Sequence, residues 1–518
     1  MADHSTTDPI EHRHEQYVLA APMWRRCRDA DAGLDALRRA ATLYVPKLSG
    51  QEKIHCADGS VIDEYEAYLH RAVWNGYPHR LWQAMTGMLM RKMPDVRAPD
   101  RTKTLLQNIT NDGVSFAAYA KRVVRDVLTV GRIGGIVDFS SSLGRPFAAT
   151  YAAENVDDWY EESWNGIKVL TYLKVRERVT MRASHGFGGV SEQRYATIEL
   201  LPLEVAVNEG RLALPPAAGI ARGDRELVTP FGVVVRKEFR KQEDGKWALI
   251  DLRIPHRGND LLPQIPFCFT NACEVGADVE KPPLLDFVDL ALAHYRNSAD
   301  HENLIHHSGQ ATLALSGFPL SDGKGNKIHY RIGGNSAMVS SEPNAKAQWA
   351  ALGGDESAPL EKSMESKEDM MAISGGRLLE TSKRSVEAAD TLMVRYAGDQ
   401  ATLLDVATTV SEGLTSQLAW LAWWSNPSLS ISEAREAVAV DINKDFLASM
   451  LPSEDFVRLV AGMQMAGFSE TLVLEASLRA LERGERITAE MVAGEIERIR
   501  TGAVRTVIPD LDPDLSEP

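Results

Sequence analysis

The densest group of carboxylates in this 518-residue sequence lies in a β-rich stretch and comprises Asp157, Asp158, Glu161 and Glu162. Carboxylates held close together can share a proton, and one of them then serves as a general acid or base. The same spacing is also typical of a solvated turn, which performs no chemistry. An enzyme with an unrecognised carboxylate site is therefore one open hypothesis, and it predicts a deep pocket in the monomer.

A second group of oxygen ligands resembles the start of a calcium loop. Asp441, Asn443 and Asp445 have the opening spacing of such a loop. Phe446 stands where the loop needs glycine, and Pro452 stands where it needs a bidentate glutamate. We expect a polar strand end here and no metal.

Gly131 follows a predicted helix, and Gly134 and Gly135 lie at the start of a predicted strand. A dinucleotide-binding loop has the reverse order, with the strand first. The glycines therefore predict a helix C-cap that leads into a strand. The sequence contains neither GxxxxGK[ST] nor GxSxG, so we expect no P-loop ATP hydrolysis and no serine-hydrolase elbow.

Histidines and cysteines do not form a recognisable metal site. The histidine clusters, His12 with His14 and His306 with His307, lack the HExxH arrangement. The cysteines are Cys27, Cys56, Cys268 and Cys273. No two of them form a CxxC pair, so neither a disulfide framework nor a zinc site is predicted. We expect no cofactor, no metal, no enzymatic activity and a reducing cytoplasm.

Composition indicates a folded chain with several cores. The sequence is 44% hydrophobic and 25% charged, and its net charge is −15. This charge opposes tight wrapping of nucleic acid, but it permits a protein that surrounds DNA without gripping it. No run of about 18 apolar residues exists, so we expect no membrane span.

The elements change character along the chain. Apolar spacing predicts helices in the N-terminal part, residues 17–130, of which the last is Phe116–Val130, and a strand at Ile133–Phe139. Alternating and β-branched runs predict an antiparallel module within residues 133–281. Helical spacing resumes at Leu284–His307 and again at Ser357–Ile373.

The two helical arms bracket one short β-like insertion, Thr312–Trp349, so together they predict a projecting finger. A loop with Gly375 and Gly376 follows, and then a helix from about Ser385 to Trp424. Unbroken, this helix would span roughly 60 Å at 1.5 Å per residue. A strand is expected near residues 437–442, and short helices are expected to begin near residues 453, 469 and 488.

The chain resembles the portal proteins of tailed bacteriophages, in the group of portal-like phage proteins formerly of unknown function. The resemblance covers most of the chain. It lies in the order of the segments and in their sequence character, and no single segment is a catalytic fingerprint. The segments that carry it are Tyr65–Ala72 with Arg80–Pro94, Val130–Asp138, Tyr151–Trp159, Ile265–Phe267 before Pro282-Pro283, and Met371–Thr381 before the long helix.

The resemblance implies an α+β fold with the portal architecture of wing, stem, clip and crown. Such a fold is mainly helical, with a β-rich wing module and a small β clip. The implied segments are a wing at 1–281, a stem helix at 282–310, a clip at 311–350, a returning stem helix at 355–374, a tunnel loop at 375–385, a long wing helix and strand at 386–445, crown helices at 450–502 and an acidic tail at 503–518.

The same resemblance implies two sites. Arg377, Lys383 and Arg384 of the tunnel loop would face DNA, although Lys383 and Arg384 read equally well as solvated residues at the start of a helix. The clip residues that would meet the packaging terminase or the head-tail adaptor are Lys324, Lys327, His329, Tyr330 and Arg331. A solvated hairpin is an equally consistent interpretation of the clip.

By resemblance, the chain would form a homo-oligomeric ring of roughly twelve subunits, closed by a heterologous interface, at one capsid vertex of the virion. The ring is the conduit for double-stranded DNA in packaging and ejection, and it is assembled in the host cytoplasm. Its partners would be the terminase large subunit, a head-tail adaptor and the major capsid or scaffolding protein. A virion or scaffolding component without a DNA channel stays open as an alternative.

Overall fold

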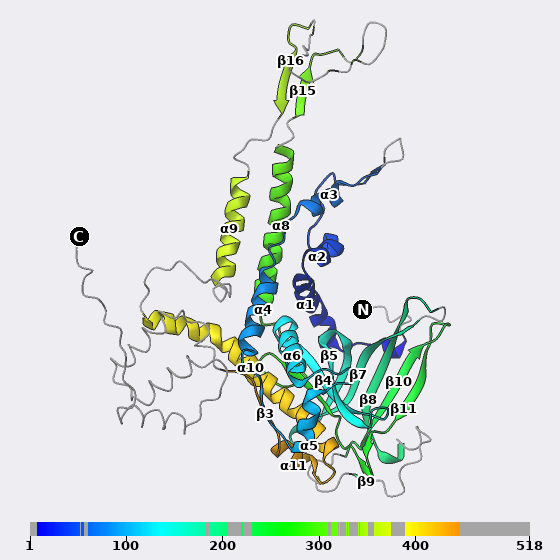
Figure 1. The fold of residues 1–518 in the computed structure, drawn as a ribbon. Coiled ribbons are helices and arrows are strands. Elements are labelled where there is room, and N and C mark those ends of the chain that lie inside the picture. Colours follow the sequence, from blue (N-terminus) through cyan, green and yellow to red (C-terminus); the bar gives the residue numbers. More distant parts are fainter. Residues whose placement is uncertain are drawn as a thin grey trace, which may run out of the picture. The chain divides into compact units, whose positions relative to one another are not determined.

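The structure is a computed structural model of the 518-residue chain (Figure 1). It describes residues 8–51, 53–55, 61–182, 186–205, 219–220, 230–308, 312–319, 321, 328, 330, 340, 342–350, 357–373 and 389–444. The chain divides into two compact units. Unit 1 comprises Met1–Trp24, Trp82–Pro283 and Thr381–Pro518, and unit 2 comprises Arg25–Leu81 and Leu284–Glu380. No helix among the described residues is long and apolar enough to cross a membrane.

Unit 1 is built on two antiparallel sheets. The larger sheet has the strand order β11-β10-β8-β7-β6. Its strands are β6 (Val156–Trp164), β7 (Ile167–Arg182), β8 (Gly189–Leu201), β10 (Val233–Lys241) and β11 (Trp247–Arg253). The smaller sheet has the order β14-β4-β5. Its strands are β4 (Arg132–Ser140), β5 (Arg145–Ala152) and β14 (Phe267–Asn271).

Shorter elements complete unit 1. A small sheet joins β12 (His256–Arg257), β13 (Asp260–Leu261) and β9 (Gly219–Ile220), and a second joins β3 (Asp95–Arg97) to β17 (Ala439–Asp441). The helices are α5 (Asp100–Lys103), α6 (Phe116–Val130), α10 (Ala389–Ser425) and α11 (Ile431–Glu436), with 3-10 turns at Pro9–Glu11, Thr104–Gln107 and Ala153–Asn155. The helices α1 (Glu15–Ala32) and α4 (Tyr77–Leu89) continue from one unit into the other.

Helix α6 begins and ends where its sequence specifies. The Ser115 side chain accepts a hydrogen bond from the Ala118 amide and so caps the N-terminus. Gly131 ends the helix in the left-handed conformation, with φ +79°, and its amide bonds to the Val127 carbonyl. Strand β4 starts at the next residue. The prediction of a helix C-cap leading into a strand is confirmed.

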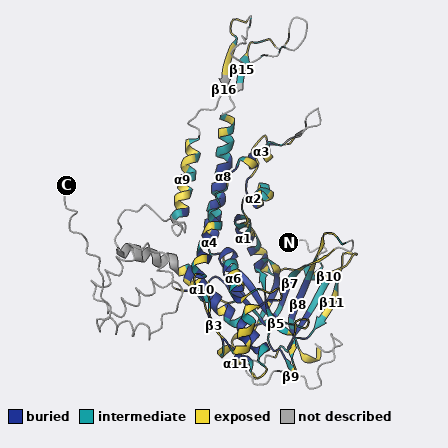
Figure 2. Ribbon diagram, in the orientation of Figure 1, coloured by how far each residue is buried: buried dark blue, intermediate teal, exposed yellow. Residues whose placement is uncertain are grey.

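Helix α10 packs onto the small sheet, and buried residues gather where it meets the strands (Figure 2). Its apolar side includes Val406, Val410 and Leu414, each at most 1% exposed. Glycines permit the close approach, because a Cβ on Gly135 of β4 would lie 2.1 Å from the Gln417 amide nitrogen. Gly135 therefore serves helix–sheet packing, whereas a Cβ on Gly134 would meet the Phe267 ring at 2.4 Å.

Unit 2 combines a helical hairpin with short N-terminal elements. The hairpin consists of α8 (Leu285–Ser308), the antiparallel pair β15 (Thr312–Ser316) and β16 (Lys346–Ala350), and α9 (Ala358–Ile373) (Figure 1). The other elements are α2 (Leu34–Ala40), a 3-10 turn at Ala41–Leu43, β1 (Ile54–His55), β2 (Val61–Ile62) and α3 (Glu64–Arg71).

Most expected elements are present, since the strands within residues 133–281, the two helical arms, the β insertion and the long helix all form. The expectation of helices throughout residues 17–130 is wrong at β1, β2 and β3. These strands have two or three residues each, too few for a repeat to show in the sequence. The described fold is a mixture of helix and sheet, in agreement with the expected α+β class. The loop 375–385, the crown 450–502 and the tail 503–518 lie outside the described residues.

Candidate functional site

The α8–β15–β16–α9 hairpin is the first candidate site, and a polar seam joins its arms. The His294 ring lies 3.1 Å from the Glu368 carboxylate, and the His301 ring lies 3.4 Å from the Glu361 carboxylate. Between them the Asn297 amide donates to the Ser363 hydroxyl at 2.9 Å. The histidines are seven residues apart, as are the glutamates, which fits one antiparallel register.

The opposite side of α8 packs against the N-terminal elements of unit 2. The Tyr68 hydroxyl donates to the Asp300 carboxylate at 2.5 Å. Trp74 meets the Tyr295 ring edge to face, with ring centroids 5.8 Å apart. Arg26 pairs with the Asp289 carboxylate at 2.9 Å. Helix α8 is thus held on two sides.

Helix α9 has only one such side. Among its described residues only Met371 is buried, and Leu360 and Met364 are half-buried. Met370 is 53% exposed. Leu360, Met364 and Met371 thus form one narrow apolar stripe, and α8 is the element that this stripe faces within the chain.

The β tip beyond the two arms contains the one predicted clip residue that the structure describes. The Tyr330 hydroxyl donates to the Pro319 carbonyl at 2.8 Å, and its ring meets Phe318 edge to face at 5.6 Å. Tyr330 therefore packs within the tip. The other four residues of that set, Lys324, Lys327, His329 and Arg331, lie outside the described residues, so their role at an interface stays a prediction.

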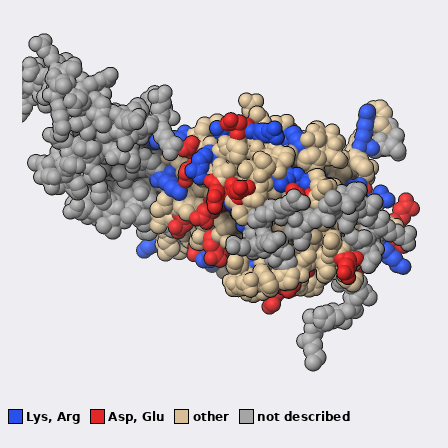
Figure 3. All heavy atoms as spheres, turned by 90° about the horizontal axis from the view of Figure 1, so that it is seen from below, with Lys and Arg blue, Asp and Glu red and all other residues tan. Residues whose placement is uncertain are grey.

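The predicted DNA-facing residues Arg377, Lys383 and Arg384 also lie outside the described residues. Charge on the described surface is mixed, since Lys and Arg alternate with Asp and Glu on the face seen from below in Figure 3. The drawn part of this face shows no broad basic field of the kind that grips a DNA backbone.

The carboxylates Asp157 and Asp158 lie on β6 and are both buried. Asp157 is 0% exposed and pairs with Arg176 at 3.4 Å. Burial raises the pKa of the Asp157 carboxyl, and the Arg176 guanidinium opposes that shift. Asp158 is 4% exposed and lies 3.2 Å from the His12 ring.

The outer pair of the carboxylate cluster is more open. Burial raises the pKa of Glu161, whose carboxylate lies 4.0 Å from the Lys168 amine, and Glu162 is exposed. The four acids therefore have separate surroundings. Among the described residues, no group of three or more His, Cys, Asp or Glu could hold a metal ion.

An N-terminal segment, residues 8–14, covers the buried acids. The Lys174 amine donates to the His12 carbonyl, and the His14 amide donates to the Asp157 carbonyl at 2.9 Å. The His14 ring stacks on Trp159 with centroids 4.0 Å apart. A substrate would have to displace this segment to reach Asp157.

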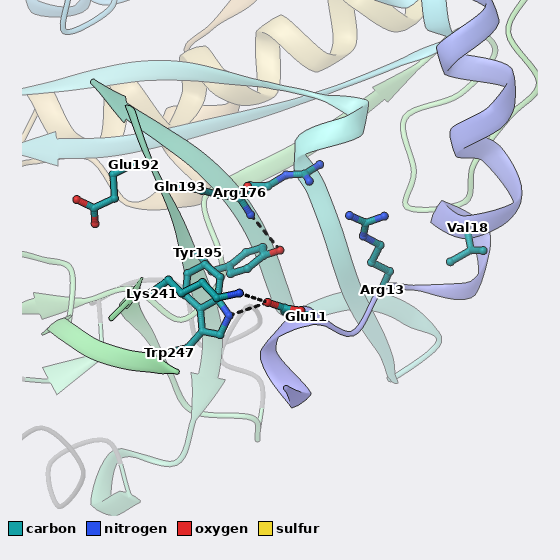
Figure 4. Close-up of a pocket in the computed structure, with 9 residues that line it drawn as sticks. All are labelled: Glu11, Arg13, Val18, Arg176, Glu192, Gln193, Tyr195, Lys241 and Trp247. Carbon is teal, nitrogen blue, oxygen red and sulfur yellow. Dashed lines mark hydrogen bonds and ion pairs between the residues drawn. The ribbon is translucent and has the colours of Figure 1, made fainter. Parts of the chain in front are cut away.

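Next to this segment lies an open groove with a volume of about 710 Å³ (Figure 4). The Glu11 carboxylate accepts from the Lys241 amine at 3.1 Å and from the Trp247 indole at 3.0 Å. Its lining residues are Glu11, Arg13, Val18, Arg176, Glu192, Gln193, Tyr195, Lys241 and Trp247. The groove is open, and its lining combines charged, polar and apolar side chains.

Three features of these sites were not anticipated from the sequence. They are the histidine–glutamate contacts of the hairpin seam, the burial of Asp157 under the N-terminal segment, and the groove beside it. Only the first left a readable signal, because His294 and His301 repeat at seven residues and so do Glu361 and Glu368. The other two depend on contacts between residues far apart in the sequence.

Comparison with known proteins gives one family model and several solved structures. A family described as a domain of unknown function (DUF4055) matches residues 283–425, which contain the hairpin and α10. No curated protein matches the chain.

The solved structures come from gene transfer agent (GTA) particles. The virion of the native GTA particle includes a chain with 12% identity and a TM-score of 0.37, and the match covers 86% of this chain and 98% of that one. The neck of the empty GTA particle, computed with C6 symmetry, matches with 11% identity, a TM-score of 0.37 and the same coverage. The neck of the native particle, computed with C12 symmetry, matches with 12% identity, a TM-score of 0.36 and the same coverage.

Proposed function

We propose that this chain is a structural protein of a tailed-phage or phage-like virion, and in particular the subunit of a portal ring. The observation that carries the proposal is the hairpin of α8 and α9 with a β pair at its tip. A stem and clip require this arrangement, and few compact enzymes need it. The order of elements around it supports the same proposal.

The exposure of α9 supports assembly with further copies. A helix in water draws most of its stability from the packing of one face, and α9 buries only Met371 fully among its described residues. Its outer side includes Glu365 and Met370, both exposed. In a ring, the neighbouring subunit would cover part of this side through a heterologous contact.

The proposed ring is a conduit and not an enzyme. It would stand at one capsid vertex, pass double-stranded DNA during packaging and ejection, and serve as a head-tail connector. The terminase large subunit and the head-tail adaptor would dock at the β tip, and the major capsid or scaffolding protein would surround the wing. A ring of about twelve subunits is proposed from the resemblance.

The test is the mass and appearance of the purified protein across a wide concentration range. Light scattering gives the mass, and negative-stain images show whether particles have a central hole. Rings of about twelve subunits support the proposal. A monomer or dimer at every concentration, together with the absence of rings from assembled particles, would overturn it. Assembly into closed shells or filaments without an axial hole would favour the alternative virion or scaffolding role.

A matched pair of variants tests the role of α9. Met370→Glu places a charge on the outer side of α9, and we expect at least a tenfold loss of rings relative to subunits, because an unpaired charge would be buried at the contact. Met93→Glu is the control, since Met93 is 77% exposed and lies in unit 1. Equal ring yields from the two variants would argue against a contact through α9.

A further inference from the structure

One face of strand β7 is basic and continues the groove. Side chains alternate along a strand, so Arg176, Arg178 and Arg182 share one face. Arg176 lies opposite Tyr195 on β8, and Arg178 lies opposite Gln193. Directly opposed residues point to the same side of a sheet, and both partners line the groove. We call Arg176, Arg178 and Arg182, with Lys241 and Arg13 at the groove, the basic face. Figure 4 shows Arg176, Lys241 and Arg13 of this set.

The carboxylates near the basic face are already paired. Asp157 pairs with Arg176 and Glu11 with Lys241. Glu192 lies at the rim, where it contacts Arg194 at 3.3 Å and Arg240 at 3.8 Å.

Arg178 and Arg13 therefore stand without an ion pair to any described carboxylate. Arg178 is exposed, and Arg13 rests on the Tyr17 ring at 5.1 Å. Arg13 also interacts electrostatically with Glu11 and Asp157, so Arg178 is the cation of the basic face that its described surroundings leave exposed.

The other face of the same strands carries the acids. Glu177 of β7 and Glu238 of β10 lie there, and both contact the buried Arg236. In a chain of net charge −15, unneutralised arginines gathered along one strand face favour an anionic partner.

We propose that the basic face binds an acidic extended segment, and that this segment is the chain's own C-terminus, Pro509–Pro518. Its acids Asp510, Asp512 and Asp514 repeat every two residues, which is the spacing of Arg176 and Arg178 on β7; Arg182 follows four residues after Arg178. Two residues of extended chain advance about 6.6 Å, so neighbouring aspartates of the tail match Arg176 and Arg178 in spacing. The tail residues lie outside the described part of the chain.

Proline placement favours docking on a face rather than pairing at a sheet edge. A proline disfavours the helical conformation of the residue before it, and prolines follow Asp512 and Ile508 in this sequence. Prolines offer no amide hydrogen, so the segment is a poor partner for a strand ladder. The basic face would therefore recognise the segment through the charges of its side chains.

The tail can reach the basic face of its own subunit. Residues 445–509, which are 65 residues, separate Lys444 from Asp510. A tethered segment acts at an effective concentration of order millimolar, so individually weak ion pairs suffice. The inference concerns one subunit and stands apart from the proposed ring.

Zero-length carbodiimide cross-linking of the native full chain tests this inference. The reagent joins a carboxylate to an amine in direct contact, and Lys241 is the amine of the basic face. Peptide mass spectrometry should show Lys241 joined to Asp510, Asp512 or Asp514. The Lys241–Glu11 cross-link, expected from their 3.1 Å contact, is the internal positive control. Its presence without any tail cross-link would overturn the proposal.

Charge reversal supplies the matched comparison. We expect R178E/R182E to lower the tail cross-link on the order of tenfold while the Lys241–Glu11 cross-link persists. The double reversal R91E/R101E makes the same change of net charge at exposed arginines elsewhere in unit 1 and should leave both cross-links unchanged. Equal loss in both variants would mean that net charge alone draws the tail, which contradicts the proposal.

Two further outcomes would also overturn it. Mixing isotopically light and heavy chains shows whether the linked peptides come from one chain, and tail cross-links only between chains would contradict docking within a subunit. If a short DNA duplex abolishes the tail cross-link and R178E/R182E abolishes duplex binding, the basic face is a nucleic-acid site instead.

Discussion

At the residue scale, Arg236 organises the charges between the two sheets of unit 1. Its guanidinium lies 2.9 Å from Glu177, 3.2 Å from Glu238 and 3.6 Å from Asp138, and it is only 8% exposed. Asp138 also accepts from Arg253. One buried cation thus neutralises carboxylates from three strands, and removing it would leave those acids facing one another.

Replacing Arg236 should therefore destabilise unit 1 strongly. We expect Arg236→Met to cost about 3–5 kcal/mol, because the partners of a buried ion pair keep their desolvation cost when the pair is broken. Arg101→Met is the control, since Arg101 is exposed and the change should stay within about 0.5 kcal/mol. Thermal unfolding followed by circular dichroism compares the two. Equal midpoints would show that solvent already screens the network.

Some residue roles could be predicted from the sequence and others could not. Ser115 and Gly131 bound α6 by local hydrogen bonds, so their types and spacing were sufficient. Gly135 is a glycine because of Gln417, which lies 282 positions further along the chain. Asp157 is buried because residues 8–14 cross over it. Contacts of this kind leave no local repeat for the sequence to display.

At the element scale, the hairpin of unit 2 also has features that the local sequence predicts and features that depend on contacts between distant segments. The helical spacing of α8 and α9 is local, and both helices form within a few residues of their expected ends. Their seam is polar, and its register depends on two helices meeting in antiparallel order. The helical arms could therefore be predicted, whereas the contacts of His294 with Glu368 and of His301 with Glu361 required the structure.

The polar seam should make the hairpin sensitive to acid. Burial lowers the pKa of His294, while Glu368 acts in the opposite direction and Lys367 reinforces the shift. The folded hairpin thus favours neutral His294, and in the unfolded chain its pKa is about 6.5. The stability is present above about pH 6.5 and is lost as the pH falls through that value.

Hydrogen exchange at α8 and α9 measures this effect, with rates corrected for the intrinsic pH dependence. We expect protection to fall between pH 7.5 and pH 5, and His294→Gln to reduce that dependence. His307→Gln is the control, because His307 is exposed on the same helix. The attribution of the acid sensitivity to His294 would be wrong if His294→Gln kept the full pH dependence or if His307→Gln removed it.

At the scale of the whole molecule, the net charge limits how tightly the proposed ring can bind DNA. Each chain carries a net charge of −15. A ring of about twelve subunits would therefore place the summed negative charge of all its subunits around the channel. Cations that contact phosphates would have to act locally against that background. Such a ring is suited to let DNA slide, because strong phosphate contacts would hold the duplex in place.

We therefore expect assembled rings to bind duplex DNA weakly and with a shallow dependence on salt. Fluorescence anisotropy of a labelled duplex, titrated with rings between about 50 and 200 mM salt, measures both quantities. A protein that makes six to ten phosphate contacts would lose about 10³–10⁵ in affinity over that range, whereas a sliding channel with few contacts should lose far less. Tight binding with a steep slope would mean that cations outside the described residues dominate the acidic background, and the ring would then be a clamp rather than a conduit.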